Sequence, residues 1–168
     1  MKHREKTSAV LPERILIVYY SFSGTTGRLA EEITRQTGGD LRPLVPVTPY
    51  AFDYNTAAKQ ARMEIEQGYC PKLTYGLEPV DGYGRIFIGS PNWFKTFAPP
   101  VLSFLRGVNL AGKTVIPFCA HGGGGFGRME SDIAKECPGA KMLPGFAGSA
   151  SFTAAEVNAW LKGIGLTK

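Results

Sequence analysis

The chain has few of the residues that build metal centres or disulfide frameworks. Its 168 residues include two histidines and three cysteines, and these cysteines, Cys70, Cys119 and Cys137, lie far apart. Their number and spacing suit neither a disulfide framework nor a zinc site, and they indicate buried free thiols in a reducing compartment. We therefore expect no metal site.

Long apolar runs are missing as well. No stretch approaches the roughly 20 apolar residues that cross a bilayer, which argues against membrane association. Residues 1–13 are charged and lack the apolar centre of a signal peptide. We therefore expect a polar leader at 1–13 and a cytoplasmic location.

Charge of one sign is present but is not concentrated. The chain has 19 Lys and Arg residues against 14 Asp and Glu residues, which gives a net charge of +5. The basic residues are scattered and do not alternate with aromatic residues, which argues against nucleic-acid binding. A basic surface would instead attract an acidic protein or an anionic small molecule.

Strand and helix patterns alternate along residues 14–168, which we expect to form a single domain. The predicted strands are 14–20, 41–47, 85–89, 113–119 and 141–146. The first predicted helix ends at Gly38–Gly39, and the next three span 53–67, 99–105 and 129–137. The final predicted helix begins after a capping box at Thr153. Residues 70–81 are expected to be irregular. The buried face of the second helix is expected to consist of Tyr54, Ala58, Ala61 and Ile65.

This alternation predicts the α/β class with a doubly wound parallel sheet. Pro43 and Pro46 in the second strand, and Pro144 in the fifth, place these strands at the edges, because proline cannot donate to a β ladder. We expect five strands in the order 2-1-3-4-5, with helices on both faces. Ligands of such sheets bind at the carboxyl ends of the strands.

The first strand ends in a loop rich in hydroxyl groups, directly before a helix. The loop consists of Ser21, Phe22, Ser23, Gly24, Thr25 and Thr26. The free N–H groups and the dipole of a helix N-terminus favour an anion. Four hydroxyls exceed what helix capping needs, and the loop has no lysine to match the nucleotide-triphosphatase motif. The loop therefore predicts a cradle for one terminal phosphate without a metal, with an ordinary capped turn as the alternative.

The loop after the third strand carries two adjacent aromatic residues. It contains Pro91, Asn92, Trp93, Phe94 and Lys95. Exposed aromatic rings are costly in water unless they cover something, and a flat ring system stacked on Trp93 or Phe94 would explain them. The alternative is that both rings fold back onto the core.

The loop after the fourth strand is rich in glycine. Its predicted binding residues are Cys119, Ala120, His121, Gly122, Gly123, Phe126 and Gly127. Consecutive glycines cost backbone entropy, so they are kept where positive φ or a close backbone approach is required. Their backbone groups could reach the polar edge of a bound ring. His121 is either a proton donor to the ligand or a structural donor that fixes the loop.

These three loops resemble those of the flavodoxin family. Ser-x-Ser-Gly-x-Thr is similar to the family's phosphate loop, and the Pro-Asn-Trp and His-Gly-Gly-Gly-Gly-Phe-Gly loops resemble those of one group of small bacterial flavodoxins. The resemblance covers about residues 14–164. It implies bound FMN, with the 5′-phosphate in the first loop and the isoalloxazine against the aromatic residues of the second.

The resemblance also implies a function. It implies an electron-transfer protein that works with a redox partner protein or a small electron acceptor, as a monomer or a homodimer. The alternative is a small FMN-dependent NAD(P)H:quinone-type oxidoreductase, so whether the chain is a dedicated enzyme stays open, and no catalytic residue is assigned.

Two residues depart from the family's pattern. Phe94 and Lys95 stand where Pro-Asn-Trp-Trp-Gly is expected. In flavodoxins, glycine there eases a peptide flip beside flavin N5 that stabilises the one-electron-reduced flavin. The substitution therefore favours two-electron chemistry, and the charge of Lys95 would favour anionic reduced FMN. The absence of an obvious nicotinamide site favours the electron carrier instead.

Two other protein classes are disfavoured by missing motifs. The ends of the first and third strands lack the acidic residues of a signalling receiver. A hydrolase would need a nucleophile such as Cys119, but there is no G-x-S-x-G elbow, and His3 lies in the leader. His121 would then be the only base.

Overall fold

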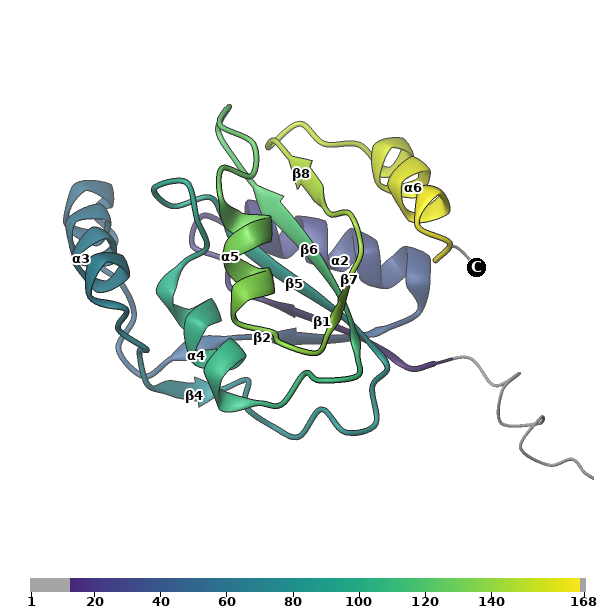
Figure 1. Cartoon of the computed structure of the whole chain (residues 1–168). Coiled ribbons are helices and arrows are strands. Elements are labelled where there is room, and N and C mark those ends of the chain that lie inside the picture. The colour runs from purple at the N-terminus through teal and green to yellow at the C-terminus, as the bar shows by residue number, and fades with distance from the viewer. Residues whose placement is uncertain (1–12, 167–168) are drawn as a thin grey trace, which may run out of the picture.

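A parallel sheet lies at the centre of the computed structural model, which describes residues 13–166 (Figure 1). Its strands run in the order β2-β1-β5-β6-β7, and β8 also pairs with β6. All of these pairings are parallel. The six strands are β1 (Ile15–Tyr19), β2 (Asp40–Pro43), β5 (Arg85–Pro91), β6 (Thr114–Ala120), β7 (Lys141–Met142) and β8 (Phe146–Gly148).

Helices cover both faces of the sheet (Figure 1). The helices are α2 (Thr25–Thr37), α3 (Tyr54–Gln67), α4 (Pro99–Gly107), α5 (Met129–Lys135) and α6 (Ala154–Gly163). Buried residues of α2 and α6 share one core with Phe87 and Phe118, whereas those of α3, α4 and α5 share the other with Ile88. The α/β class and the doubly wound arrangement are confirmed.

The predicted number of strands is wrong, because the fifth strand is divided. The segment expected at 141–146 forms β7, which pairs with the start of β6, and β8, which pairs with its end. Pro144 lies between them and has no N–H for the ladder. A Cβ at Gly145 would lie 2.3 Å from the carbonyl oxygen of Pro117, so the chain passes close to β6 at this point.

The second predicted strand, at 41–47, is also shorter than expected. After β2 the chain leaves the central sheet, and β3 (Val45–Pro46) pairs antiparallel with β4 (Leu73–Tyr75) in a separate two-stranded sheet. Because β4 falls within 70–81, the prediction of an irregular connection there is wrong. Prolines on both sides of Leu44 limit the ladder that this edge can form.

Helix α3 is held by small side chains. Asp53 caps it as predicted for its start, since Asp53 Oδ2 accepts from the Thr56 N–H at 2.9 Å. Its buried residues are Ala57 and Ala61, whereas Tyr54 is 67% exposed. Of the predicted face, Ala61 is buried, Ala58 and Ile65 are half-buried and Tyr54 is exposed, because the helix is turned so that Ala57 and Ala61 face the core.

The predicted leader lies outside the described residues except for Glu13, which pairs with Arg85 (Oε1 to Nε, 3.2 Å). Four of the 19 basic and one of the 14 acidic residues also lie outside. The described residues therefore carry 15 basic and 13 acidic side chains, a net charge of +2. More than half of the basic excess thus belongs to the undescribed ends of the chain.

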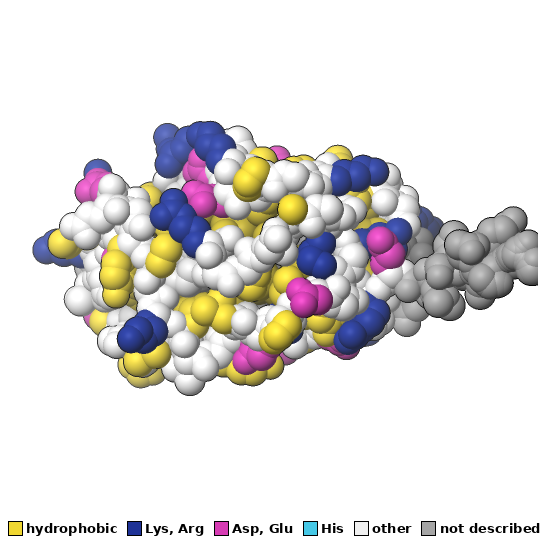
Figure 2. Space-filling model, turned by 60° about the horizontal axis from the view of Figure 1, so that its bottom comes forward, with side chains coloured by type: hydrophobic (Ala, Val, Ile, Leu, Met, Phe, Trp, Pro, Cys, Tyr) yellow, Lys and Arg dark blue, Asp and Glu magenta, His cyan; other side chains and the backbone are white. Residues whose placement is uncertain are grey.

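The surface of the described domain is mixed in character. Figure 2 shows apolar side chains among Lys, Arg, Asp and Glu on the face that lies at the bottom of Figure 1. Exposed apolar residues on and beside β3 and β4 include Val45, Val47, Tyr75 and Leu77. Within residues 13–166, no helix combines the length and apolar character that a membrane span requires.

The packing of β5 on β6 gives a first prediction. Gly89 is the register partner of the buried Phe118, and a Cβ at position 89 would lie 2.1 Å from Phe118 Cζ. We expect Gly89→Ala to lower the free energy of unfolding by about 1–3 kcal/mol through overpacking. Urea unfolding measures this. Gly163→Ala is the matched control, because no atom lies within 4 Å of its Cβ position, and an equal loss in both variants would contradict the packing argument.

Candidate functional site

The structure brings the three predicted loops together at the carboxyl ends of β1, β5 and β6. The rings of Phe22 and Trp93 join the first two loops, with centroids 5.6 Å apart. Asn92 joins the second and third loops. Its backbone N–H donates to the Ala120 carbonyl at 2.8 Å, and its Nδ2 donates to the Gly125 carbonyl at 2.6 Å.

The first loop leaves hydrogen-bond donors free at the start of α2. Gly24 stands at the N-cap with φ of 102°, and no side chain caps the helix at that position. Ser21 Oγ accepts from the Gly27 N–H at 3.1 Å. The backbone N–H groups of residues 23–26 donate to no acceptor among the described residues.

Thr26 supplies the most specific polar group of this loop. Its side chain is 2% exposed, yet its hydroxyl makes no hydrogen bond to any described residue. A buried hydroxyl without a partner costs free energy, so a partner from outside the chain would stabilise it. The free N–H groups and this hydroxyl together fit a small anion, and the capped-turn alternative accounts only for the Gly27 N–H, which Ser21 Oγ accepts.

Arg28, in the first turn of α2, is engaged away from this loop. Its guanidinium donates to the Ala150 carbonyl at 3.1 Å and lies 5.3 Å from the ring centroid of Phe152. These contacts join α2 to the loop before α6, so they account for a cation in the first helical turn without an anion.

The two aromatic residues of the second loop behave differently. Trp93 is half-buried and meets Tyr20 and Tyr50 edge to face, at centroid distances of 5.8 and 5.2 Å. Phe94 is 43% exposed. Trp93 therefore folds only partly back onto the core and keeps some of its surface accessible in the cavity beside it, whereas Phe94 stays exposed. A cavity of about 130 Å³ lies between this loop, Phe22 and the start of α3.

Two tyrosines, Tyr20 and Tyr50, pack against Trp93. Burial raises the pKa of Tyr20, as does the charge of Glu64. Burial also raises the pKa of Tyr50, whose hydroxyl donates to Glu64 Oε1 at 2.6 Å. Both stay neutral. They line a cleft of about 610 Å³ beside the first loop, and Tyr20 could have been marked by its aromatic character at the end of an apolar run.

Residues 93–96 form a tight turn with an unusual backbone. The N–H of Trp93 donates to the Thr96 carbonyl at 2.9 Å, and the Thr96 N–H returns to the Trp93 carbonyl at 3.1 Å. The central residues Phe94 and Lys95 have φ of 55° and 70°. Positive φ at both central positions is the type I′ turn, which prefers Asn-Gly. For other residues, the left-handed region costs roughly 1–2 kcal/mol each.

His121 fixes the glycine loop. Its Nδ1 accepts from the Gly123 N–H at 2.9 Å, so the neutral ring carries its proton on Nε2. Its own backbone N–H donates to the Gly148 carbonyl at 3.0 Å. These contacts favour the structural role, although His121 acts as an acceptor rather than as the expected donor.

Only one glycine of this loop is required by a close contact. Gly127 has φ of 59°, and a Cβ there would lie 2.6 Å from the Lys95 carbonyl oxygen. The backbone of the third loop therefore packs directly on that of the second. No atom lies within 4 Å of a Cβ position at Gly122 or Gly123, which leaves open space there.

Cys119 is the buried end of β6. Burial raises the pKa of its thiol to about 12, and its Sγ lies 3.5 Å from the Gly125 carbonyl. A thiol of this kind is protonated at neutral pH and is a poor nucleophile. The hydrolase alternative therefore lacks its nucleophile.

Comparison with known proteins agrees with this geometry. The family described as Flavodoxin matches residues 14–164. The chain is similar to a structure from Bacteroides eggerthii DSM 20697 that is assigned as a flavoprotein, with 30% identity over 91% of this chain and 98% of that chain, and a TM-score of 0.82. A second such structure, from Bacteroides uniformis ATCC 8492, shares 27% identity over 89% and 98% of the two chains, with a TM-score of 0.80.

A more distant structure shows the same fold. It is a flavoprotein in complex with FMN from Lactobacillus acidophilus NCFM, with 22% identity over 89% of this chain and 99% of that chain, and a TM-score of 0.72. Among proteins with curated functions, none matches the chain.

The turn at 93–96 gives a second prediction. We expect Lys95→Gly to raise the free energy of unfolding by up to about 1 kcal/mol, because glycine adopts positive φ without strain but loses more backbone entropy. Urea unfolding measures the change. Lys95→Ala is the control, because it removes the charge but keeps the strained backbone, and it should match the parent. A destabilised Lys95→Gly variant would show that the turn is not strained.

Proposed function

The chain belongs to the flavodoxin family, and we propose that it binds FMN and transfers electrons. One observation carries this proposal. A helix N-terminus with free N–H groups and a buried, unpartnered Thr26 hydroxyl lies beside an exposed aromatic turn. FMN joins a phosphate to a flat ring, and this site offers donors for the first and aromatic surface for the second.

The phosphate would be held without a basic side chain. The donors are the N–H groups of residues 23–26 and the hydroxyls of Ser23, Thr25 and Thr26. Hydrogen bonds to a charged group contribute about 1.5–3 kcal/mol each, so a few of them suffice for tight binding. Arg28 is engaged elsewhere, which leaves the α2 N-terminus as the main source of positive potential.

The ring would be held by the second and third loops. Trp93 and Phe94 offer aromatic surface, and the backbone of Gly122 and Gly123 can approach a polar ring edge. When bound, FMN supplies the redox chemistry, and the protein supplies orientation and electrostatics. The ammonium of Lys95 would place positive charge near the ring and so stabilise a reduced anion.

We favour an electron carrier that serves a redox partner protein or a small electron acceptor in the cytoplasm, as a monomer or a homodimer. One observation favours the second candidate, a small FMN-dependent NAD(P)H:quinone-type oxidoreductase. The Lys95 N–H donates to Asn92 Oδ1 at 2.9 Å, which restrains the peptide that a one-electron carrier would need to turn.

The phosphate loop gives the first test. The purified protein should be yellow, and Thr26→Val should weaken FMN binding about tenfold through loss of one charge-assisted hydrogen bond. Riboflavin, which lacks the phosphate, should bind both proteins equally. Fluorescence titration measures both affinities. Thr34→Val, on the same helix, is the control, because the Thr34 hydroxyl bonds only to the Ala30 carbonyl.

Two results would count against this proposal. A colourless protein that does not take up added FMN would contradict the cofactor. An equal loss of FMN and riboflavin binding in Thr26→Val would show that the hydroxyl acts on the ring or on the fold rather than on the phosphate.

The charge of Lys95 gives the second test. We expect Lys95→Gly and Lys95→Ala both to lower the two-electron potential of the bound flavin, whereas Lys95→Arg should keep it. A shift of about 30 mV corresponds to 1.4 kcal/mol for a two-electron couple. Anaerobic titration with a reference dye measures the potential. If both charge-removing variants stay within about 10 mV of the parent, Lys95 does not act on the flavin.

A further inference from the structure

The turn Trp93–Thr96 holds two left-handed residues, neither of which is glycine. Such conformations persist only where the surrounding structure over-determines them, and they cluster at functional sites. The restraints on this turn come from Asn92 before it and from the segment 127–132 after the glycine loop.

The backbone restraints centre on Lys95. Its N–H donates to Asn92 Oδ1 at 2.9 Å, and its carbonyl accepts from the Arg128 N–H at 2.6 Å. Gly127 allows this approach, because a Cβ there would lie 2.7 Å from Lys95 Cα. The turn is therefore attached to the segment that enters α5.

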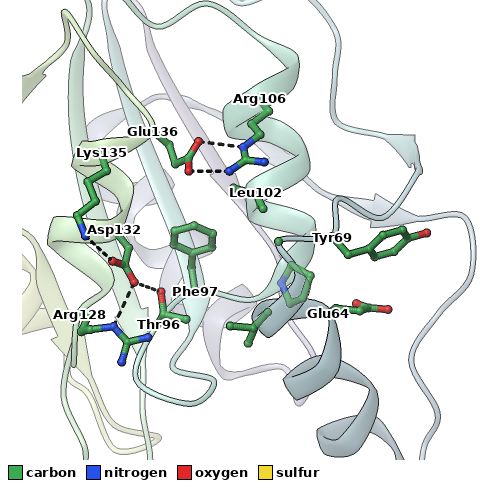
Figure 3. Close-up of a pocket in the computed structure, with 13 residues that line it drawn as sticks. Glu64, Tyr69, Thr96, Phe97, Leu102, Arg106, Arg128, Asp132, Lys135 and Glu136 are labelled. Atoms are coloured by element: carbon green, nitrogen blue, oxygen red, sulfur yellow. Dashed lines mark hydrogen bonds and ion pairs between the residues drawn. The ribbon is translucent and has the colours of Figure 1, made fainter.

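The side-chain restraint comes from Asp132 on α5. The hydroxyl of Thr96, a residue that is 5% exposed, donates to Asp132 Oδ2 at 2.6 Å. The carboxylate also lies 3.6 Å from Arg128 Nε and 3.8 Å from Lys135 Nζ (Figure 3). Two basic side chains thus lie beside the carboxylate that accepts from this buried hydroxyl. Without Asp132, that hydroxyl has no acceptor among the described residues.

Packing on the outer side of this hydrogen bond is incomplete. A cavity of about 240 Å³ lies between α3, α4 and α5, and it is lined by Thr96, Phe97 and Asp132 among others (Figure 3). Because no side chain fills this space, steric contacts restrain Thr96 less on that side. The hydrogen bond to Asp132 therefore supplies more of the restraint.

We propose that Asp132 is a positioning residue: through Thr96 it holds the turn in its left-handed form and so fixes Trp93 and Phe94 where they receive the flavin ring. This role rests on the proposed function for its purpose, but the restraint itself exists in the protein without flavin. Asp132 acts through Thr96, and no contact with a bound group is needed.

The first experiment uses the protein without flavin. In a Trp160→Phe background, Trp93 is the only tryptophan, and its near-UV circular dichroism reports the turn. We expect Asp132→Ala to lose this signal and Asp132→Asn to keep it, because the amide oxygen still accepts from Thr96. Lys135→Ala is the control, because it removes one ion pair and leaves the hydrogen bond. An unchanged signal in Asp132→Ala would overturn the proposal.

A milder pair covers the case in which Asp132→Ala fails to fold. Thr96→Val removes the donor and keeps the shape of the side chain, so it should lose the Trp93 signal, whereas Thr96→Ser should keep it. Retention of the signal in a folded Thr96→Val would overturn the proposal equally.

The second experiment separates the turn from other effects of Asp132. Asp132→Ala should weaken FMN and riboflavin binding alike, by about tenfold, because the ring side of the site is affected. In a Lys95→Gly background the same substitution should cost less than about threefold, because glycine needs no support at positive φ. Equal losses in both backgrounds would show that Asp132 does not act through the turn and would overturn the proposal.

The two proposals fail separately. If the protein binds no flavin but Asp132→Ala still loses the Trp93 signal, the restraint is supported and the proposed function is contradicted. If the protein is yellow and Asp132→Ala changes neither the signal nor the affinity, the proposed function is supported and the positioning role is overturned.

Discussion

The site depends on one constraint, the parallel pairing of β5 with β1 on one side and β6 on the other. In this register Tyr19 pairs with Gly89, and Pro91 pairs with Ala120, so all three strands end at one edge of the sheet. Each following loop then lies within hydrogen-bond or van der Waals reach of the next, as Asn92 shows. Loops that are up to about 100 residues apart in the sequence form one surface because the pairing is parallel.

In the second loop, the observed backbone conformation disagrees with the local preference of the residues that adopt it. A type I′ turn built from Phe94 and Lys95 opposes the backbone preference of both residues. It persists because Gly127 admits the Lys95 backbone and because Asp132 accepts from Thr96. Contacts from a segment some 30 residues away thus offset the strain in this loop. As a result, a turn with one aromatic and one charged side chain lies beside the candidate site.

Short-range sequence patterns predicted much of this fold. The predictions failed where pairing between segments that are distant in the sequence determines the structure. The strands with continuous apolar runs were correct because burial on both faces leaves a clear pattern. The two edge strands were not predicted correctly. Pro144 divides one of them, and the chain around Leu44 leaves the central sheet and enters a second sheet. Edge pairing depends on which partner is available, and the apolar pattern of a segment does not contain that information.

The sequence by itself determined the α/β class of fold and the three loops that meet at the carboxyl ends of the strands, because hydrophobic period, proline and glycine act over a few residues. Only the tertiary structure decided that Trp93 turns inward while Phe94 stays exposed, that His121 accepts rather than donates, and that Asp132 reaches Thr96. These outcomes depend on contacts between distant segments, and such contacts exist only once the sheet has aligned the strand ends.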